Sequence, residues 1–386
     1  MKSMLFMAGK IDMLHATVQE LFTNITGGIS VPTVNAGPLT NLVEAMIAAT
    51  GSSQAEAKAV AENLVEANLM GHDSHGVGLA PRYMTHANSG TLTPGGSLSV
   101  VSDNGAYLLL DGDMGYGQVI GREAMQLGLE KARSQGVAIV GLRNVHHLGR
   151  IGAWGEICAQ AGFISIHYVN GTGHAPIVAT HGGYEARYST NPYCTAIPAT
   201  DKNPMVVADF ATSTMAQGKV RVAHYAGDTL PDGAVVGPDG YPSNDPGVMF
   251  SDPQGAMLPM SGHKGTCLAV LCEVLAGGLT GGGTALPSRQ NDHTIRNNML
   301  TIIVDPNGFA ADIPFADDID NLIDVAKSSK PAAGFDRIMY PGDPERLRRQ
   351  ERAANGIPID ENTWAEMRRM GIAAGLDAGA FDSIIR

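Results

Sequence analysis

Short apolar runs alternate with helical segments through the middle of this 386-residue chain, and this alternation most constrains the fold. The runs read as buried strands, and they lie at 107–110, 137–140, 163–166, 205–208 and 299–304. Segments of helical length lie between several of them, at 118–133, 150–161 and 264–279. Strands alternating with helices are typical of α/β proteins. We therefore predict an α/β domain over residues 106–310.

Both flanks of this region have a helical pattern. Ser53 and Glu56 have the spacing of a capping box and predict the start of a helix, and Gly71 is expected to end that same helix. The pattern becomes helical again after about residue 310. We expect residues 39–105 and 311–386 to pack together as one helical domain. Residues 1–38 lack a clear pattern, and we treat them as an N-terminal extension without a function.

The composition excludes several classes of protein. The chain has 26 basic and 38 acidic residues, a formal net charge of −12, which argues against general nucleic-acid binding. Its four cysteines lack the C-x-x-C spacing of a zinc site, and no apolar stretch is long enough to span a bilayer. The basic run at 346–352 has the pattern of a solvated helix face. We predict a cytoplasmic protein with no nucleic-acid and no membrane partner.

The segment Asp73-Ser74-His75-Gly76-Val77 is the first candidate for chemistry, at the end of an amphipathic helix. An imidazole can give and recover a proton near neutral pH, as proton transfer to a carbonyl oxygen requires. Ser74 is placed to orient the ring, and Gly76 would let a substrate or cofactor approach the backbone. A histidine in a turn is more often a surface residue, so downstream motifs must support this interpretation.

A glycine-rich turn at 115–121 follows the first strand and invites comparison with a dinucleotide-binding fingerprint. Its G-x-G-x-x-x-G spacing is one residue too long, and no acid follows at the position that would hold a ribose. We interpret these glycines as allowing close packing of strand and helix.

Four later segments open a helix after glycine or small residues, and any one of them is more often simple capping. They lie at 144–152, 205–213, 261–265 and 340–345. Backbone N–H groups at a helix start bind anions, and the segments also carry Arg150, Asp209 and Lys264. In the last segment, Asp343 is expected as N-cap and Pro344 at the first helical position. Together the four segments favour a phosphorylated cofactor.

Several motifs occur in an order that resembles a known family. They are Asp-Ser-His-Gly around His75, His-His-x-Gly-Arg-Ile-Gly at 146–152, Ser-Thr-Asn-Pro at 189–192, Asp-Phe-Ala-Thr-Ser at 209–213, and His-Lys-Gly at 263–265. From about residue 39 to the C-terminus, the chain resembles the malate/L-lactate dehydrogenase-like family of NAD(P)-dependent oxidoreductases. Residues 163–170 are most similar to its hydroxycarboxylate dehydrogenase B subgroup.

This resemblance implies a non-Rossmann NAD(P)-binding α/β domain with a mixed sheet, plus a helical domain built from both chain termini. It implies NAD or NADP as cofactor and a homodimer with the active site near the subunit interface. The histidine at position 75 would be the proton donor, with Ser74 or His147 orienting or assisting it. Cofactor contacts would fall on His75, Gly149, Arg150, Ile151, Val207, Ala208, Asp209, Phe210, Ala211, His263, Lys264, Asn297, Gly342, Asp343, Pro344 and Glu345.

One position departs from many members of this family, which carry an arginine four residues after the catalytic histidine. Here that residue is Leu79, so another cation, Arg82 or Arg150, must bind the substrate carboxylate, or the substrate is bulkier and less polar. We expect interconversion of a 2-oxo acid, aromatic or bulky, and a 2-hydroxy acid.

Two alternatives remain at this point. The first is reduction of a cyclic ketimine, which members of the family also perform. The second is a metal-dependent hydrolase using residues 72, 73, 75, 146 and 147, although their spacing matches no recognised metal site.

Overall fold

The structure is a computed structural model that describes residues 32–386 except 291–292 and 310–312. The described helices are α2 (Ala36–Ala48), α3 (Gln54–Leu69), α4 (Ala80–Asn88), α5 (Gly117–Gln135), α6 (Gly152–Gln160), α7 (Gln217–Ala226), α8 (His263–Cys272), α9 (Phe315–Lys327), α10 (Asp343–Asn355), α11 (Glu361–Ala373) and α12 (Ala378–Asp382). The expected extension lies largely outside the described residues; Thr33 and Val34 already form a strand, and α2 begins at Ala36.

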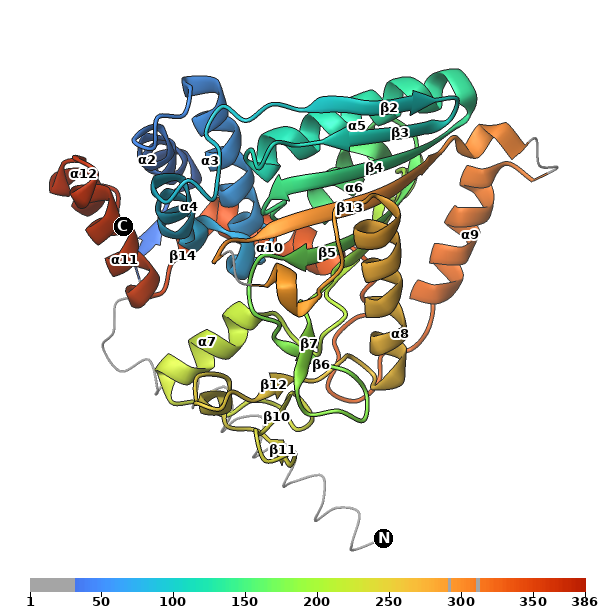
Figure 1. Ribbon diagram of the computed structural model, residues 1–386. Coiled ribbons are helices and arrows are strands. Elements are labelled where there is room, and N and C mark those ends of the chain that lie inside the picture. Colours follow the sequence, from blue (N-terminus) through green and yellow to red (C-terminus); the bar gives the residue numbers. More distant parts are fainter. Residues whose placement is uncertain (1–31, 291–292, 310–312) are drawn as a thin grey trace, which may run out of the picture.

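The described strands form three sheets (Figure 1). They are β1 (Thr33–Val34), β2 (Ser99–Asn104), β3 (Tyr107–Asp111), β4 (Val137–His146), β5 (Ile164–Thr172), β6 (Val178–Ala179), β7 (Ala186–Tyr188), β8 (Tyr193–Ile197), β9 (Val206–Phe210), β10 (Val235–Val236), β11 (Pro242–Ser243), β12 (Ala256–Met257), β13 (Arg296–Val304) and β14 (Ile357–Pro358). All five strands predicted from apolar runs are present.

The largest sheet has seven strands in the order β2-β3-β4-β13-β5-β8-β9. Only β3 and β4 run parallel, so the sheet is mixed, as predicted. Helices α5 and α6 cover one face, and α8 with the π-helix Glu273–Leu279 covers the other (Figure 1). Neighbouring residues of β4 show the two faces: Val140 lies against α5, and Gly141 lies against Thr280. Both faces are therefore buried, which is why its strands read as apolar runs.

The glycines at 115–121 serve packing, as predicted. A Cβ on Gly117 would lie 2.3 Å from the backbone oxygen of His147, and one on Gly121 would lie 2.9 Å from the Trp154 ring. The start of α5 therefore lies directly against the loop after β4. This contact holds the backbone of His147 against the start of α5.

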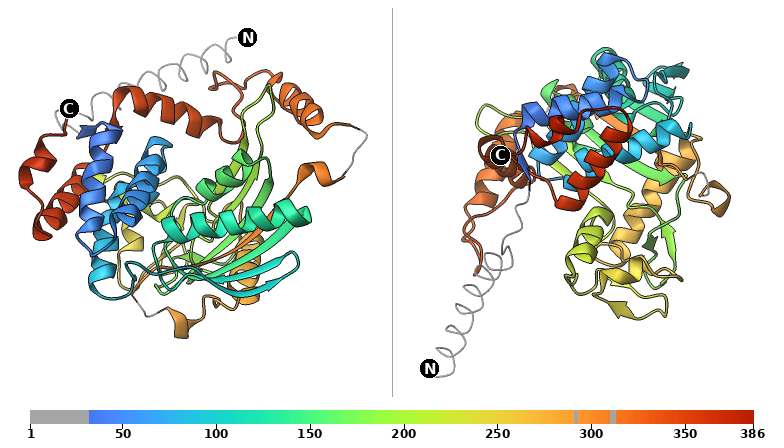
Figure 2. Two further views of the ribbon diagram at one scale, coloured as in Figure 1. Left: turned by 90° about the horizontal axis from the view of Figure 1, so that it is seen from above. Right: turned by 90° about the vertical axis from the view of Figure 1, so that its left-hand side faces the viewer.

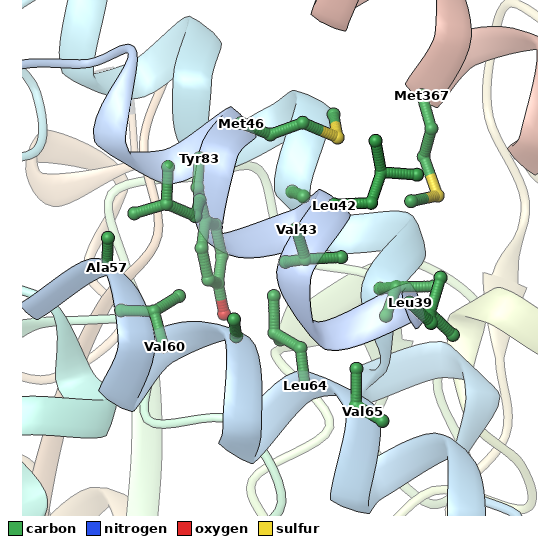
Figure 3. Packing of buried hydrophobic residues seen from close by; sticks show 14 of the residues in the cluster. Leu39, Leu42, Val43, Met46, Ala57, Val60, Leu64, Val65, Tyr83 and Met367 are labelled. Atoms are coloured by element: carbon green, nitrogen blue, oxygen red, sulfur yellow. The ribbon is translucent and has the colours of Figure 1, made fainter. Parts of the chain in front are cut away.

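Helices from the two ends of the chain share one hydrophobic core, and Figure 2 shows them side by side. Leu39, Val43 and Leu64 from the N-terminal side pack in the same cluster as Met367 and Phe381. Strands β1 and β14 pair antiparallel and join the two segments. The Tyr83 ring belongs to this cluster too, beside Val60 (Figure 3), so one catalytic-site neighbour is anchored in the helical core.

A small five-stranded sheet, β11-β10-β12-β6-β7, has its own apolar cluster and carries α7. Helix α7 reaches the turn that contains His75, where a Cβ on Gly218 would lie 2.7 Å from the Ser74 Cβ. No helix among the described residues is long and apolar enough to cross a membrane.

Candidate active site

His75 lies just past the end of the preceding helix, as the sequence predicted, in a separate 3₁₀ turn, Asp73–His75. Helix α3 ends at Leu69, because Gly71 takes a left-handed conformation with φ +83° and His72 N–H bonds back to Ala67 O. A second 3₁₀ turn, Val77–Leu79, then leads into α4. His75 is thus carried by a short, irregular segment that needs other groups to hold it.

Those groups are Asn68 and Arg352. The Asn68 amide donates to Asp73 at 2.6 Å, and its carbonyl accepts from Val77 N–H at 2.8 Å. The Arg352 guanidinium binds both Asp73 oxygens, at 2.6 and 3.0 Å. The carboxylate of Asp73 therefore anchors the turn from two sides.

Two sequence interpretations are corrected here. A Cβ on Gly76 would lie 2.1 Å from the Asn68 side-chain oxygen, so this glycine makes room for Asn68 and not for a ligand. The basic run at 346–352 is more than a solvated face, because Arg352 holds the His75 turn and Arg349 pairs with Glu66 on α3 at 2.6 Å. The pattern of charges gave no sign of partners so distant along the chain.

The predicted catalytic residues Ser74, His75 and His147 lie together. The Ser74 hydroxyl is 3.0 Å from His75 Nδ1, which leaves Nε2 of this ring without a described partner. The His147 ring stacks on His75 with their centroids 5.6 Å apart. Gln118 Nε2 donates to the Tyr83 hydroxyl at 2.9 Å, and that hydroxyl is hydrogen-bonded to His147 Nδ1 at 2.7 Å. His147 is therefore held through one ring nitrogen, as His75 is.

Both imidazoles are neutral at pH 7 in this arrangement. Desolvation, with smaller contributions from His72 and Arg150, lowers the pKa of His75 to about 4. Burial and the neighbouring His75 lower the pKa of His147 well below its ordinary value. A negative charge brought beside His75 would act in the opposite direction and favour its protonated form.

His146 faces away from this pair. Its Nε2 is 2.8 Å from His86 Nδ1, and both rings are buried. The described residues contain no group of three or more His, Cys, Asp or Glu side chains that could hold a metal ion.

The loop before α6 provides a set of backbone donors. The residues Gly149, Arg150 and Ile151 are buried, and their N–H groups have no acceptor among the described residues. The next amide, of Gly152, donates to Asp209 at 2.7 Å. Consecutive free amides at a helix start suit a phosphate, and a buried amide without an acceptor is costly.

Arg150 is not free to bind a ligand carboxylate or phosphate. It is 3% exposed, and its guanidinium forms two parallel bonds with Glu156, at 3.0 and 2.6 Å. Burial raises the pKa of nearby Asp209, although Arg150 and His72 act against this shift. The interpretation of Arg150 as a contact for a carboxylate or phosphate stays a prediction, and any such contact would be made by a guanidinium already paired with Glu156.

The start of α10 lies beside β9, the outer strand of the large sheet. Val207 N–H bonds to Pro341 O at 3.4 Å, so the predicted cofactor residues 207–211 and 342–345 adjoin. Glu345 reaches His72 Nε2 at 3.4 Å, which brings α10 next to the His75 turn. Burial would raise the Glu345 pKa, but its contacts with His72 leave it below the ordinary value.

Gly342, with φ +92°, takes the N-cap position predicted for Asp343, and Asp343 is the first residue of the helix, ahead of Pro344. The Asp343 carboxylate accepts from Tyr340 N–H at 2.9 Å and pairs with Arg346 and Lys327, at 2.5 and 3.3 Å. Its side chain is therefore committed to the helix start.

The remaining predicted cofactor residues divide into two places. Asn297 is on β13, where its oxygen accepts from Leu148 N–H at 2.9 Å and its amide donates to Asn170 O at 3.1 Å, so it supports the loop after β4. His263 and Lys264 begin α8, and Met260 N–H just before them bonds to Thr212 O, the residue directly after the predicted stretch 207–211.

Sequence reasoning missed Tyr83, Gln118, Asn68 and His174. Tyr83 and Gln118 gave no local signal, because each lies on an ordinary amphipathic helix and meets its partner only in the folded chain. His174 follows β5, and its charge interacts with that of His147. For His174, its position directly after a strand was the one indication in the sequence that it could belong to the site.

Comparison with known proteins shows that this mixed α/β fold is that of the oxidoreductases of the hydroxycarboxylate dehydrogenase class. The sequence model of the family described as malate/L-lactate dehydrogenase matches residues 34–368. Hydroxycarboxylate dehydrogenase B of Escherichia coli (strain K12) is 41% identical over 332 residues, which are 86% of this chain and 91% of that protein. The chain belongs to the malate/L-lactate dehydrogenase family, as its motifs predicted.

Solved structures agree with this assignment. The sulfolactate dehydrogenase of Methanocaldococcus jannaschii superposes with a TM-score of 0.77 at 30% identity, over 90% of this chain and 98% of that one. The delta1-piperideine-2-carboxylate reductase of Pseudomonas syringae pvar. tomato gives 0.76 at 30% identity, over 88% and 99%. The family fold thus accommodates proteins named for an oxo or hydroxy acid and for an imine.

Proposed function

We propose that this protein is an NAD(P)-dependent 2-hydroxycarboxylate dehydrogenase that interconverts a 2-oxo acid, aromatic or bulky, and the corresponding 2-hydroxy acid, with His75 as proton donor. The observation that carries the proposal is the pairing of His75 with His147. Ser74 holds one nitrogen of His75, so the other nitrogen is available to a substrate oxygen. Family membership supports the reaction class.

The residues present suit a nicotinamide dinucleotide. The free amides of residues 149–151 would receive a phosphate, and the start of α10 at Gly342 would lie against the same ligand beside β9. The carboxylates of Asp209 and Glu345 are acceptors suited to ribose hydroxyls. When bound, the nicotinamide supplies or accepts the hydride.

In the direction of reduction, His75 Nε2 gives a proton to the oxygen that becomes the alcohol. The anionic substrate raises the pKa of His75 on binding, so the imidazole is charged when its proton is needed. His147 Nε2 would form a hydrogen bond beside it. In the opposite direction neutral His75 accepts the proton, and its low pKa in the free site suits that role.

The test follows NADH and NADPH oxidation against a panel of 2-oxo acids, with wild-type protein and the variants His75→Gln and His75→Ala. We expect turnover to fall about 10²–10⁴-fold in both variants, because a positioned acid contributes about this factor. Cofactor affinity, measured by fluorescence titration, should change much less. Wild-type turnover in His75→Ala would contradict the proposal.

Reduction of a cyclic ketimine is the second candidate, and the structural likeness to the piperideine carboxylate reductase favours it. His75 would then protonate a nitrogen in place of an oxygen. The two functions are distinguished by measuring the rates of reduction of phenylpyruvate and of delta1-piperideine-2-carboxylate side by side.

The protein is further proposed to act as a homodimer with its active site near the subunit interface. Helix α9 supports this, because it buries only Asp320 and Ile323 while Leu322 and Val325 are 54% and 71% exposed. Figures 1 and 2 show α9 at the periphery, away from the large sheet. Exposed apolar residues of this kind mark a face that a second copy would cover.

A further inference from the structure

A 2-oxo acid carries a carboxylate next to its carbonyl, and the site needs a cation for it. Leu79, four residues after His75, is apolar, and the charge of the buried Arg150 guanidinium is already paired with Glu156 through two hydrogen bonds. Arg143, at the end of β4, is also paired, with Asp111 at 3.0 Å. The cation must therefore come from another element near the histidine pair.

Arg82 meets this requirement. It lies on α4, one helical turn after Leu79 and directly before Tyr83, whose hydroxyl is 2.7 Å from His147. The positive charge of Arg82 contributes to the lowered pKa values of His86, His146, His147 and His174, which agrees with its place on the helix beside these rings. Arg82 is exposed and has no acidic partner among the described residues.

A second arginine is carried by the helix of the small sheet. Helix α7 lies against the His75 turn at Gly218 and Ser74, and Arg221 follows one turn later on the same helix. Helix α4 packs against the turn Val77–Leu79 and helix α7 against the turn Asp73–His75, so Arg82 and Arg221 are both carried by elements that adjoin His75. Arg221 likewise has no ion pair or hydrogen bond within the described part of the chain. Two positive charges near one another repel when no carboxylate of the protein pairs with them. A bound anion between the two guanidinium groups would offset this repulsion.

We propose that Arg82 and Arg221 bind the carboxylate of the substrate from α4 and α7 while His75 acts on the adjacent carbonyl. Arginine suits this task, because its planar fork matches a carboxylate with two parallel bonds. The two residues would take the role of the arginine that many members of the family carry at the position of Leu79. This inference rests on the proposed function. It explains how the proposed reaction would be specific for substrates that carry a carboxylate.

The experiment compares an acid with its uncharged ester. Wild-type protein, Arg82→Gln, Arg82→Lys and Arg221→Gln are assayed with phenylpyruvate and pyruvate, each beside its methyl ester. Arg133→Gln is the matched control, since Arg133 is exposed at the far end of α5. The measured quantity is the ratio of kcat/KM for acid over ester, with KM and kcat reported separately.

We expect the wild-type ratio to favour the acid strongly, and Arg82→Gln to lower it about 10- to 100-fold through a higher KM for the acid. The ester should be reduced at the wild-type rate, which shows that the variant is folded. Arg82→Lys should recover part of the ratio, Arg221→Gln should lower it less, and Arg133→Gln should leave it unchanged.

An unchanged acid-to-ester ratio in Arg82→Gln, or an equal loss for acid and ester, would overturn the inference while leaving the proposed function in place. Failure of the wild-type protein to reduce any acid or ester would instead overturn the proposed function, and the inference with it.

Discussion

At the scale of single residues, the protein contains several buried imidazoles kept neutral by their surroundings, and His75 is one of them. His75, His86 and His167 all have lowered pKa values, about 4, 4 and 3, with desolvation as the leading cause. Proton transfer at His75 therefore depends on what the ligand brings. A negatively charged substrate restores the basicity that burial removes.

His167 allows a direct test of this charge balance. It is 0% exposed and lies 2.9 Å from both Thr301 and Ser165 hydroxyls, outside the active site. Its pKa is near 6.5 when unfolded and about 3 when folded, so the unfolded chain binds more protons between these values. The stability that neutral His167 contributes is complete above pH 6.5 and decreases as the pH falls toward 3.

Urea unfolding of wild-type protein and His167→Gln, from pH 7 to pH 4.5, measures this contribution. The difference in free energy of unfolding between them should shrink by up to about 1.4 kcal/mol per pH unit below pH 6.5. A difference that stays constant with pH would show that His167 keeps its ordinary pKa in the folded protein.

At the scale of elements, the turn that carries His75 packs closely against Asn68 at Gly76. Gly76→Ala would place a methyl group 2.1 Å from the Asn68 oxygen and displace the side chain that holds Asp73 and Val77. Overpacking of this kind destabilises by about 1–3 kcal/mol. We expect a lower Tm and a larger loss of activity.

Gly37→Ala is the control, because a Cβ there meets nothing within 4 Å. Thermal unfolding and turnover of both variants separate local displacement from a general effect of replacing glycine. Wild-type turnover in Gly76→Ala would mean that Asn68 does not hold the turn.

The sequence predicted the regular elements better than the irregular ones. Apolar runs such as 299–304 predicted their strands, because burial on both faces requires apolar residues at every position. The 3₁₀ turn at 73–75 and the π-helix at 273–279 had no periodic signal. Of the site, Ser74, His75 and His147 were predicted from local motifs, whereas Tyr83 and Arg352 were not, since their partners are far away in the sequence.

At the scale of the whole molecule, the exposed apolar face of α9 bears on oligomeric state. Leu322→Glu with Val325→Glu should convert the proposed dimer to a monomer, because charges at these positions would be buried without partners. Asn321→Glu, at an exposed polar position of the same helix, adds one negative charge beside that face without replacing an apolar residue and serves as control. Light scattering after gel filtration gives the mass; a monomeric wild-type chain would contradict the proposal.

The bond between Arg352 and Asp73 joins positions 279 residues apart. During synthesis on a ribosome, the histidine turn therefore emerges long before its arginine anchor. All seven strands of the large sheet also precede Arg352 in the chain. A nascent polypeptide can thus contain the whole sheet while the turn of the proposed proton donor still lacks this partner.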